Sequence, residues 1–94
     1  MTDKFKNVPV DEDTRIQFRH EAKFGKYDIL YERWSWEGIS AESLIFVSDD
    51  VSDLTDEELE REVRKSPLVK KDSAVTIKRV DSGFTFVNFN FETT

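Results

Sequence analysis

The sequence contains no cysteine among its 94 residues. Disulfides and thiolate metal sites are therefore excluded, and a hydrophobic core has to stabilise the fold unaided. Glycine and proline are also scarce, with three and two residues, which predicts regular elements joined by short loops. The longest continuous apolar run covers only residues 44–47. A run of that length is far too short for a transmembrane helix, so we expect no membrane association.

Basic charge is in deficit, with 14 Lys and Arg residues against 20 Asp and Glu residues and a formal net charge of −6. This balance argues against nucleic acids and anionic membranes as partners. The first thirteen residues lack the apolar segment of a signal peptide, so the expected location is cytoplasmic. Aromatic residues make up 13% of the chain, and rings in this number predict a compact folded domain.

The chain divides into a short arm and one domain. Residues 1–13 mix charges with the isolated apolar residues Phe5, Val8 and Val10 and show no periodicity. We predict a flexible N-terminal arm over residues 1–13 and a single α+β domain over residues 14–94.

Alternation of apolar and polar residues predicts several β-strands. Residues 14–24 place one set on a single face, and a turn follows at Gly25. The set on that face is Ile16, Phe18, His20, Ala22 and Phe24. The expected strands are residues 14–24, 26–36, 41–48, 73–80 and 84–92, with a polar loop at 49–53.

One helix is expected over residues 55–65. Thr55 and Glu58 have the spacing of a capping box, and Leu59 and Val63 lie on one helical face. The resulting order is β-β-β-α-β-β, which predicts an α+β fold: a four- to five-stranded antiparallel sheet with one helix packed on a face. The expected core is Ile16, Phe18, Ile29, Leu44, Phe46, Leu59, Val63, Val75, Ile77, Val87 and Phe89.

Residues with catalytic or metal-binding chemistry are few. The single histidine, His20, lies on the apolar face of its strand, which favours a core or rim position over a general base. The carboxylates at 49–58 lack the glycine of a calcium loop and are explained by a loop and a helix cap. We predict no metal, no cofactor and no catalytic residue.

Two of the expected strands are apolar on both faces. Residues 27–36 and 84–91 carry large rings on each side, whereas one helix can cover only one face of a sheet. Either these rings lie at an interface, or a strongly twisted or partly closed sheet buries both sets internally.

These features favour a small acidic non-enzymatic protein-interaction module, of the inhibitor, immunity, phage or accessory type. Residues 49–62 hold eight acidic residues and one basic residue, so the expected partner is a basic protein. The candidate interface consists of Trp34, Trp36, Phe84, Phe86, Asp53, Asp56, Glu57 and Glu60. The alternative is a small enzyme or small-molecule binder with a pocket around Tyr31, Glu32 and His20.

Self-association is also expected. Residues 84–92 lie near a chain end and have no proline, so we predict an edge strand and a homodimer that either pairs these edges or stacks the exposed face. Its contact face would carry Phe84, Phe86, Asn88 and Asn90, with Trp34 and Trp36 as second choice. The alternative is a monomer whose arm covers this edge through Phe5, Val8 and Val10.

Overall fold

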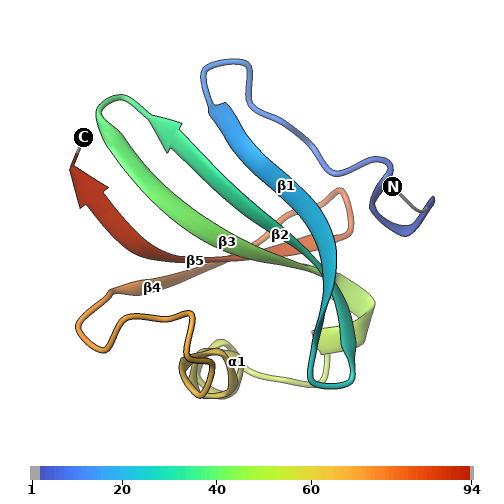
Figure 1. Cartoon of the computed structure of the whole chain (residues 1–94). Coiled ribbons are helices and arrows are strands. Elements are labelled where there is room, and N and C mark those ends of the chain that lie inside the picture. The colour runs from blue at the N-terminus through green and yellow to red at the C-terminus, as the bar shows by residue number, and fades with distance from the viewer. Residues whose placement is uncertain (1–2, 94) are drawn as a thin grey trace.

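The computed structural model describes residues 3–93, and these residues form one antiparallel sheet with one α-helix. The sheet has the order β1-β2-β3-β5-β4 and is strongly twisted, with α1 beneath it (Figure 1). This is the α+β fold that the sequence predicts. The elements are η1 (Asp3–Phe5), β1 (Arg15–Phe24), β2 (Tyr27–Trp36), β3 (Ile39–Val47), η2 (Ser48–Val51), α1 (Asp56–Arg64), β4 (Val75–Arg79) and β5 (Phe84–Thr93), where η denotes a 3₁₀-helix.

Tight turns connect the first three strands. The two residues between β2 and β3, Glu37 and Gly38, have φ angles of 45° and 79°. Two successive positive φ values define the type I′ turn, whose twist matches that of the flanking strands. The β2–β3 hairpin is therefore closed by two residues.

The helix begins and ends where the sequence predicts. The Glu58 amide donates to Thr55 Oγ1 at 3.1 Å, and the Thr55 amide donates to Glu58 Oε1 at 2.9 Å. This reciprocal capping box lowers the pKa of Glu58, because hydrogen bonds with the Thr55 backbone amide and then with the Thr55 side chain stabilise its charged form. Leu54 and Leu59, on either side of the cap, both pack into the core and fix the direction of entry.

The first face of the sheet, toward α1, carries the main core. Leu59 and Val63 of α1 are buried against side chains of β2, β3 and β5. The buried members of this cluster are Ile29, Tyr31, Leu44, Phe46, Val51, Leu59, Val63, Val87 and Phe89. Seven of the predicted core residues are among them, and Val75 and Ile77 pack at their margin.

The second face of the sheet is covered at one end by the N-terminal segment. Phe5 and Val8 are buried there against Leu30, Ile45 and Phe84. The Lys4 ammonium group lies 3.0 Å from the Asp28 carboxylate of β2 and fixes the same segment from outside. The segment therefore covers a face of the sheet. The monomer predicted from the sequence as an alternative has this segment over the edge formed by residues 84–92.

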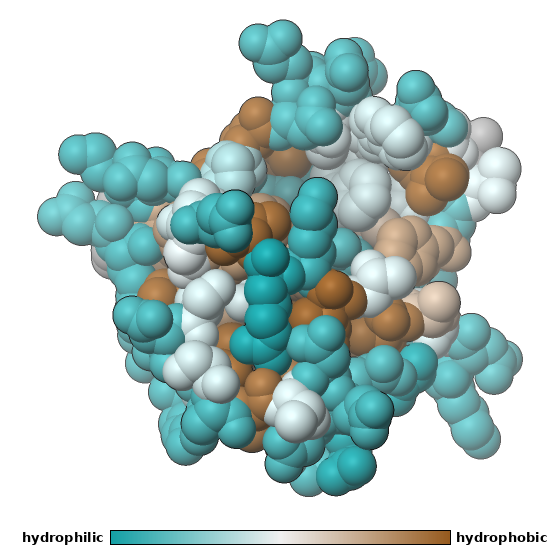
Figure 2. Space-filling view, turned by 180° about the vertical axis from the view of Figure 1, so that it is seen from behind, coloured by the Kyte–Doolittle hydropathy of each residue, from teal (hydrophilic) through white to brown (hydrophobic). Residues whose placement is uncertain are grey.

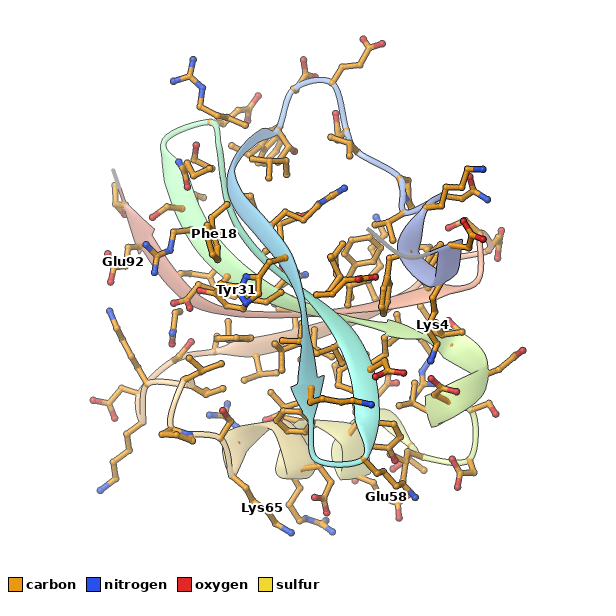
Figure 3. All side chains as sticks on the ribbon, turned by 45° about the vertical axis from the view of Figure 1, so that its right-hand side comes forward. Lys4, Phe18, Tyr31, Glu58, Lys65 and Glu92 are labelled. Atoms are coloured by element: carbon orange, nitrogen blue, oxygen red, sulfur yellow. The ribbon has the colours of Figure 1, made fainter. Side chains whose placement is uncertain are left out.

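A β-bulge in β1 corrects the predicted alternation of that strand. The register shifts between Ile16, which pairs with Trp34, and Phe18, which pairs with Arg33. Ile16 therefore lies on the second face and Phe18 on the first, where α1 does not reach it. Phe18 is exposed and packs only at the rim, with its ring 6.0 Å from that of Tyr31 (Figure 3). The prediction of Phe18 as a core residue is wrong for this reason.

The prediction of an edge strand at 84–92 is also wrong. β5 lies between β3 and β4 and pairs with both, so its backbone groups are already used. The edges are β1 and β4. Nearness to a chain end misled the prediction, whereas apolar residues on both faces are typical of a central strand.

Two irregular segments depart from the expected loops. The predicted polar loop at 49–53 contains η2, whose Val51 is fully buried in the main core. In β5, Asn90 has a φ of 57° and forms a bulge opposite β3. The bulge turns the Asn90 amide toward Glu42 on the first face, away from the face of Asn88.

The outer surface is mostly polar. Figure 2 shows apolar side chains gathered in several small patches, with polar side chains between them, on the side of the molecule seen from behind.

Candidate functional site

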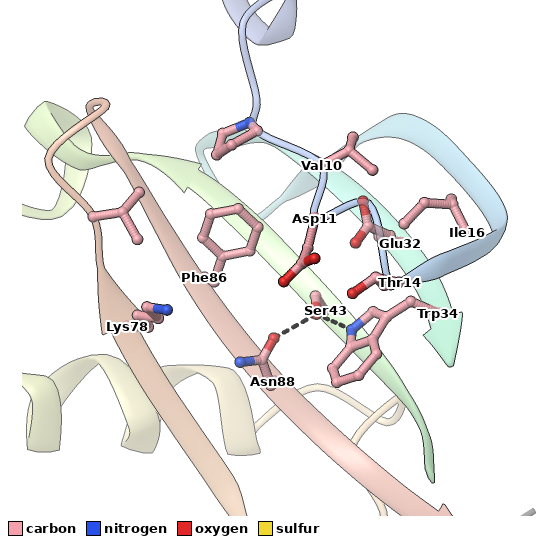
Figure 4. A pocket seen from close by; sticks show the side chains of 12 residues that line it. Val10, Asp11, Thr14, Ile16, Glu32, Trp34, Ser43, Lys78, Phe86 and Asn88 are labelled. Atoms are coloured by element: carbon pink, nitrogen blue, oxygen red, sulfur yellow. Dashed lines mark hydrogen bonds between the residues drawn. The ribbon is translucent and has the colours of Figure 1, made fainter. Parts of the chain in front are cut away.

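The uncovered part of the second face forms an open groove of about 400 Å³. It lies between the sheet and the segment that follows Val8, and Figure 4 shows side chains from β2, β3, β4 and β5 around it. The residues of interest in its lining are Asp11, Ile16, Glu32, Trp34, Phe86 and Asn88.

A chain of hydrogen bonds forms the groove floor. Trp34 Nε1 donates to Ser43 Oγ at 2.7 Å, and Ser43 Oγ donates to Asn88 Oδ1 at 2.5 Å. Asn88 Nδ2 then donates to Thr76 Oγ1 at 3.2 Å. These bonds cross four strands and hold the Trp34 ring in one orientation. Because Ser43 donates to an amide oxygen and not to a base, its hydroxyl is not activated as a nucleophile.

A buried ion pair forms one wall. Glu32 is only 5% exposed, and its Oε2 accepts hydrogen bonds from both Nε and Nη2 of Arg19 on β1. Burying a carboxylate is costly unless a partner compensates its charge, and Arg19 does so here.

Asp11 also lines the groove and is held by a tight turn. The Asp13 amide donates to Asp11 Oδ1 at 3.0 Å, and the Thr14 amide donates to the Asp11 carbonyl at 3.0 Å. A hydrogen bond from a backbone amide to the side chain of the Asp two residues earlier defines an Asx-turn. This turn holds the Asp11 carboxylate in place before any ligand binds. Figure 4 shows the Asp11 carboxylate directed into the groove.

Beyond the groove, the end of the sheet carries exposed apolar side chains. Trp36, Ile39 and Phe91 are 40%, 39% and 38% exposed. Trp36 and Ile39 are register partners at the closed end of the β2–β3 hairpin, and Ile39 pairs next with Thr93 of β5. This apolar end patch, defined by Trp36, Ile39 and Phe91, continues the row that begins with Trp34.

The structure separates the two halves of the predicted interface. Trp34 and Trp36 lie on β2, with Trp34 on the second face, whereas the acidic residues lie on or before α1, on the first face. Phe86 lines the groove, but Phe84 is buried beneath Phe5.

The acidic residues themselves are partly used within the protein. Asp56 accepts a hydrogen bond from Arg79 at 2.9 Å, and Glu60 pairs with Arg64 at 2.9 Å. Asp53 and Glu57 are exposed and form no ion pair within residues 3–93. The acidic helix is thus largely an ordinary solvated surface with internal partners.

The alternative pocket around Tyr31, Glu32 and His20 does not form. Tyr31 and His20 share the first face, with ring centroids 5.6 Å apart. Glu32 lies on the opposite face, because successive residues of a strand point to opposite sides of a sheet. The three side chains therefore cannot act on one substrate.

Sequence reasoning missed a polar network at the rim of the first face. Tyr31 Oη donates to Glu42 Oε1, and Asn90 Nδ2 donates to Glu42 Oε2 at 2.7 Å. Burial, followed by the bond to Glu42, raises the pKa of Tyr31. The only sign of this network in the sequence is Asn90. Asparagine adopts positive φ more readily than the β-branched and aromatic residues around it, so its presence in this strand favours a bulge.

Residues 3–93 lack two further kinds of functional feature, a metal site and a membrane-spanning helix. No group of three or more His, Asp or Glu side chains there has an arrangement that could hold a metal ion. No helix in the same part of the chain has the length and apolar character needed to cross a membrane.

The chain matches no protein-family model, no curated protein and no solved structure.

Proposed function

We propose that this protein binds another protein through the uncovered part of its second sheet face. The observation that carries the proposal is the apolar end patch of Trp36, Ile39 and Phe91, which continues into the groove beside Trp34. Contiguous exposed apolar side chains are typical of interaction sites, and tryptophan is enriched where binding energy concentrates. The function is that of a non-enzymatic interaction module.

The rigid backing of this surface supports the same proposal. Trp34 is fixed by its bond to Ser43, and Ser43 in the groove floor is itself fully buried. A preorganised surface loses little conformational entropy on binding, so more of the contact energy appears as affinity.

A second copy of the chain is one form that the partner can take. The predicted dimer through an edge at β5 is not proposed again, because β5 is central. Trp34 and Trp36, the second choice of contact, belong to the surface proposed here. Light scattering at micromolar concentration distinguishes the two cases: a mass of one chain means that the partner is a different protein.

The test compares the apolar end patch with a matched apolar site elsewhere. The double variant Trp36→Ser/Ile39→Ser removes two of the three apolar side chains of the patch, and Leu68→Ser removes an exposed leucine of the loop after α1. Each tagged variant is used as bait in extract of the source cells, and its fold is checked by thermal melting. The affinity of a retained protein, measured after purification, is expected to fall about tenfold or more in the double variant and to be unchanged in Leu68→Ser.

Two results contradict the proposal. One is a partner that binds the Trp36→Ser/Ile39→Ser variant as tightly as the wild type. The other is a wild-type bait that retains no protein and has the mass of a single chain.

A further inference from the structure

The groove carries two carboxylates that each keep one oxygen for a ligand. The turn uses Asp11 Oδ1 and leaves Oδ2 out of that hydrogen bond, and Figure 4 shows the Asp11 carboxylate directed into the groove. Arg19 uses Glu32 Oε2 twice, and no hydrogen bond to Oε1 is formed within residues 3–93. Both residues line the same space. Two acceptor oxygens that line one groove fit a ligand group with several N–H donors.

The net charge at this end of the groove comes from Asp11. Arg19 compensates the charge of Glu32, so this pair is close to neutral as a unit. Lys78 also lines the groove, but it lies on β4, and β3 and β5 separate it from Glu32 on β2. Three strand spacings place these two strands about 14 Å apart. That strand spacing exceeds the Debye length of about 8 Å at physiological ionic strength, so salt largely screens the repulsion between Lys78 and a cation held beside Glu32.

Aromatic rings line the same groove as these oxygens. Trp34 and Phe86 line the groove, and the bond from Trp34 Nε1 to Ser43 fixes the indole plane. The face of a tryptophan ring attracts cations, and a planar guanidinium stacks on it while it donates in its own plane to carboxylates. A lysine ammonium group lacks this planar geometry.

From this arrangement we infer that the groove binds an arginine side chain of the partner protein. This inference rests on the proposed function. The guanidinium donates to Asp11 Oδ2 and Glu32 Oε1 and lies against the Trp34 ring. The methylene groups of the arginine pack toward Phe86. The complementarity of charge also agrees with a basic partner for a chain of net charge −6.

The experiment uses N-acetyl-arginine amide as probe and N-acetyl-citrulline amide as its neutral isostere. The wild-type protein is titrated with each and followed by the indole N–H signals of Trp34 and Trp36 in nitrogen-15 NMR spectra. The arginine compound is expected to shift the Trp34 signal saturably below about 10 mM, since one side chain supplies only weak affinity. The citrulline compound is expected to bind about tenfold more weakly, because it lacks the charge. The Trp36 signal, outside the groove lining, is expected to move little.

The variant Asp11→Asn tests the assignment without loss of the turn, because an asparagine oxygen also accepts the Asp13 amide. Its affinity for the arginine compound is expected to fall about fivefold, whereas Glu12→Gln, a neighbouring exposed carboxylate, leaves the affinity unchanged. Equal binding of the two compounds, absence of saturable shifts at Trp34, or unchanged affinity in Asp11→Asn overturns the inference. A partner lost by Trp36→Ser/Ile39→Ser but bound normally by Asp11→Asn leaves the proposed function standing and refutes only the arginine site.

Discussion

The ring of Phe5 packs on the ring of Phe84 with their centroids 6.4 Å apart. This contact joins the N-terminal segment to the second face of the sheet and places Asp11 above the groove. The groove therefore depends on the N-terminal segment, although this segment contributes no strand to the sheet.

Replacement of Phe5 by alanine is expected to destabilise the protein by about 3 kcal/mol, because a fully buried phenylalanine leaves a cavity and loses its transfer free energy. Val10→Ala, at an exposed position of the same segment, is expected to cost less than about 0.5 kcal/mol. Urea denaturation measures both. Equal stability of the Phe5→Ala variant and the wild type would mean that the segment is not docked on the sheet.

The sequence predicted α1 and the strands because these elements have local signals. Thr55 and Glu58 form a capping box three residues apart, and the hairpin turns contain glycine at positions of positive φ. Such signals depend on neighbouring residues only. The helix and the antiparallel sheet followed from them without knowledge of tertiary contacts.

The groove could not be predicted in the same way, because it depends on contacts distant in sequence. The bulge between Ile16 and Phe18 moves Ile16 to the groove side, and nothing in the alternation marks it. Phe5 contacts Phe84 across most of the chain, and an aperiodic segment gives no indication of the face that it covers. The residue type of Trp34 predicts an interface position, whereas no feature of the sequence singles out Asp11.

Removal of the helix cap tests whether the capping box of Thr55 and Glu58 stabilises α1. Thr55→Ala removes the acceptor for the Glu58 amide and is expected to cost about 1 kcal/mol. Glu57→Ala serves as control, since Glu57 is exposed in the first turn and caps nothing. Thermal or urea denaturation checks the difference, and equal effects of the two substitutions would show that the cap does not stabilise α1.

Variants of the Arg19–Glu32 pair test whether the buried carboxylate needs a compensating charge. Arg19→Met leaves the Glu32 carboxylate uncompensated inside the protein and is expected to cost about 3 kcal/mol. The double variant Arg19→Met/Glu32→Leu removes both charges and is expected to recover most of that loss. Arg15→Met, at an exposed position of the same strand, is the control. A double variant as unstable as Arg19→Met would refute this explanation.

Alkaline pH is expected to destabilise the protein through Tyr31. Its pKa is raised above the ordinary value of 10.0 in the folded state, mainly by burial, so the folded state holds the phenolic proton to higher pH than the unfolded state. The stabilising contribution is fully present below 10.0 and is lost as the pH rises through the folded pKa. Absorbance of tyrosinate is expected to show a transition displaced to high pH that Tyr31→Phe lacks. If both proteins lose stability equally above this pH, Tyr31 is not the responsible group.

The most direct test of the binding surface is an NMR map of the protein with the partner retained in the bait experiment. Chemical-shift changes are expected to concentrate at Trp34, Trp36, Ile39 and Asn88, on the uncovered half of the second face. Changes confined to α1 and the exposed carboxylates Asp53 and Glu57, with no change at the tryptophan side chains, would contradict the account.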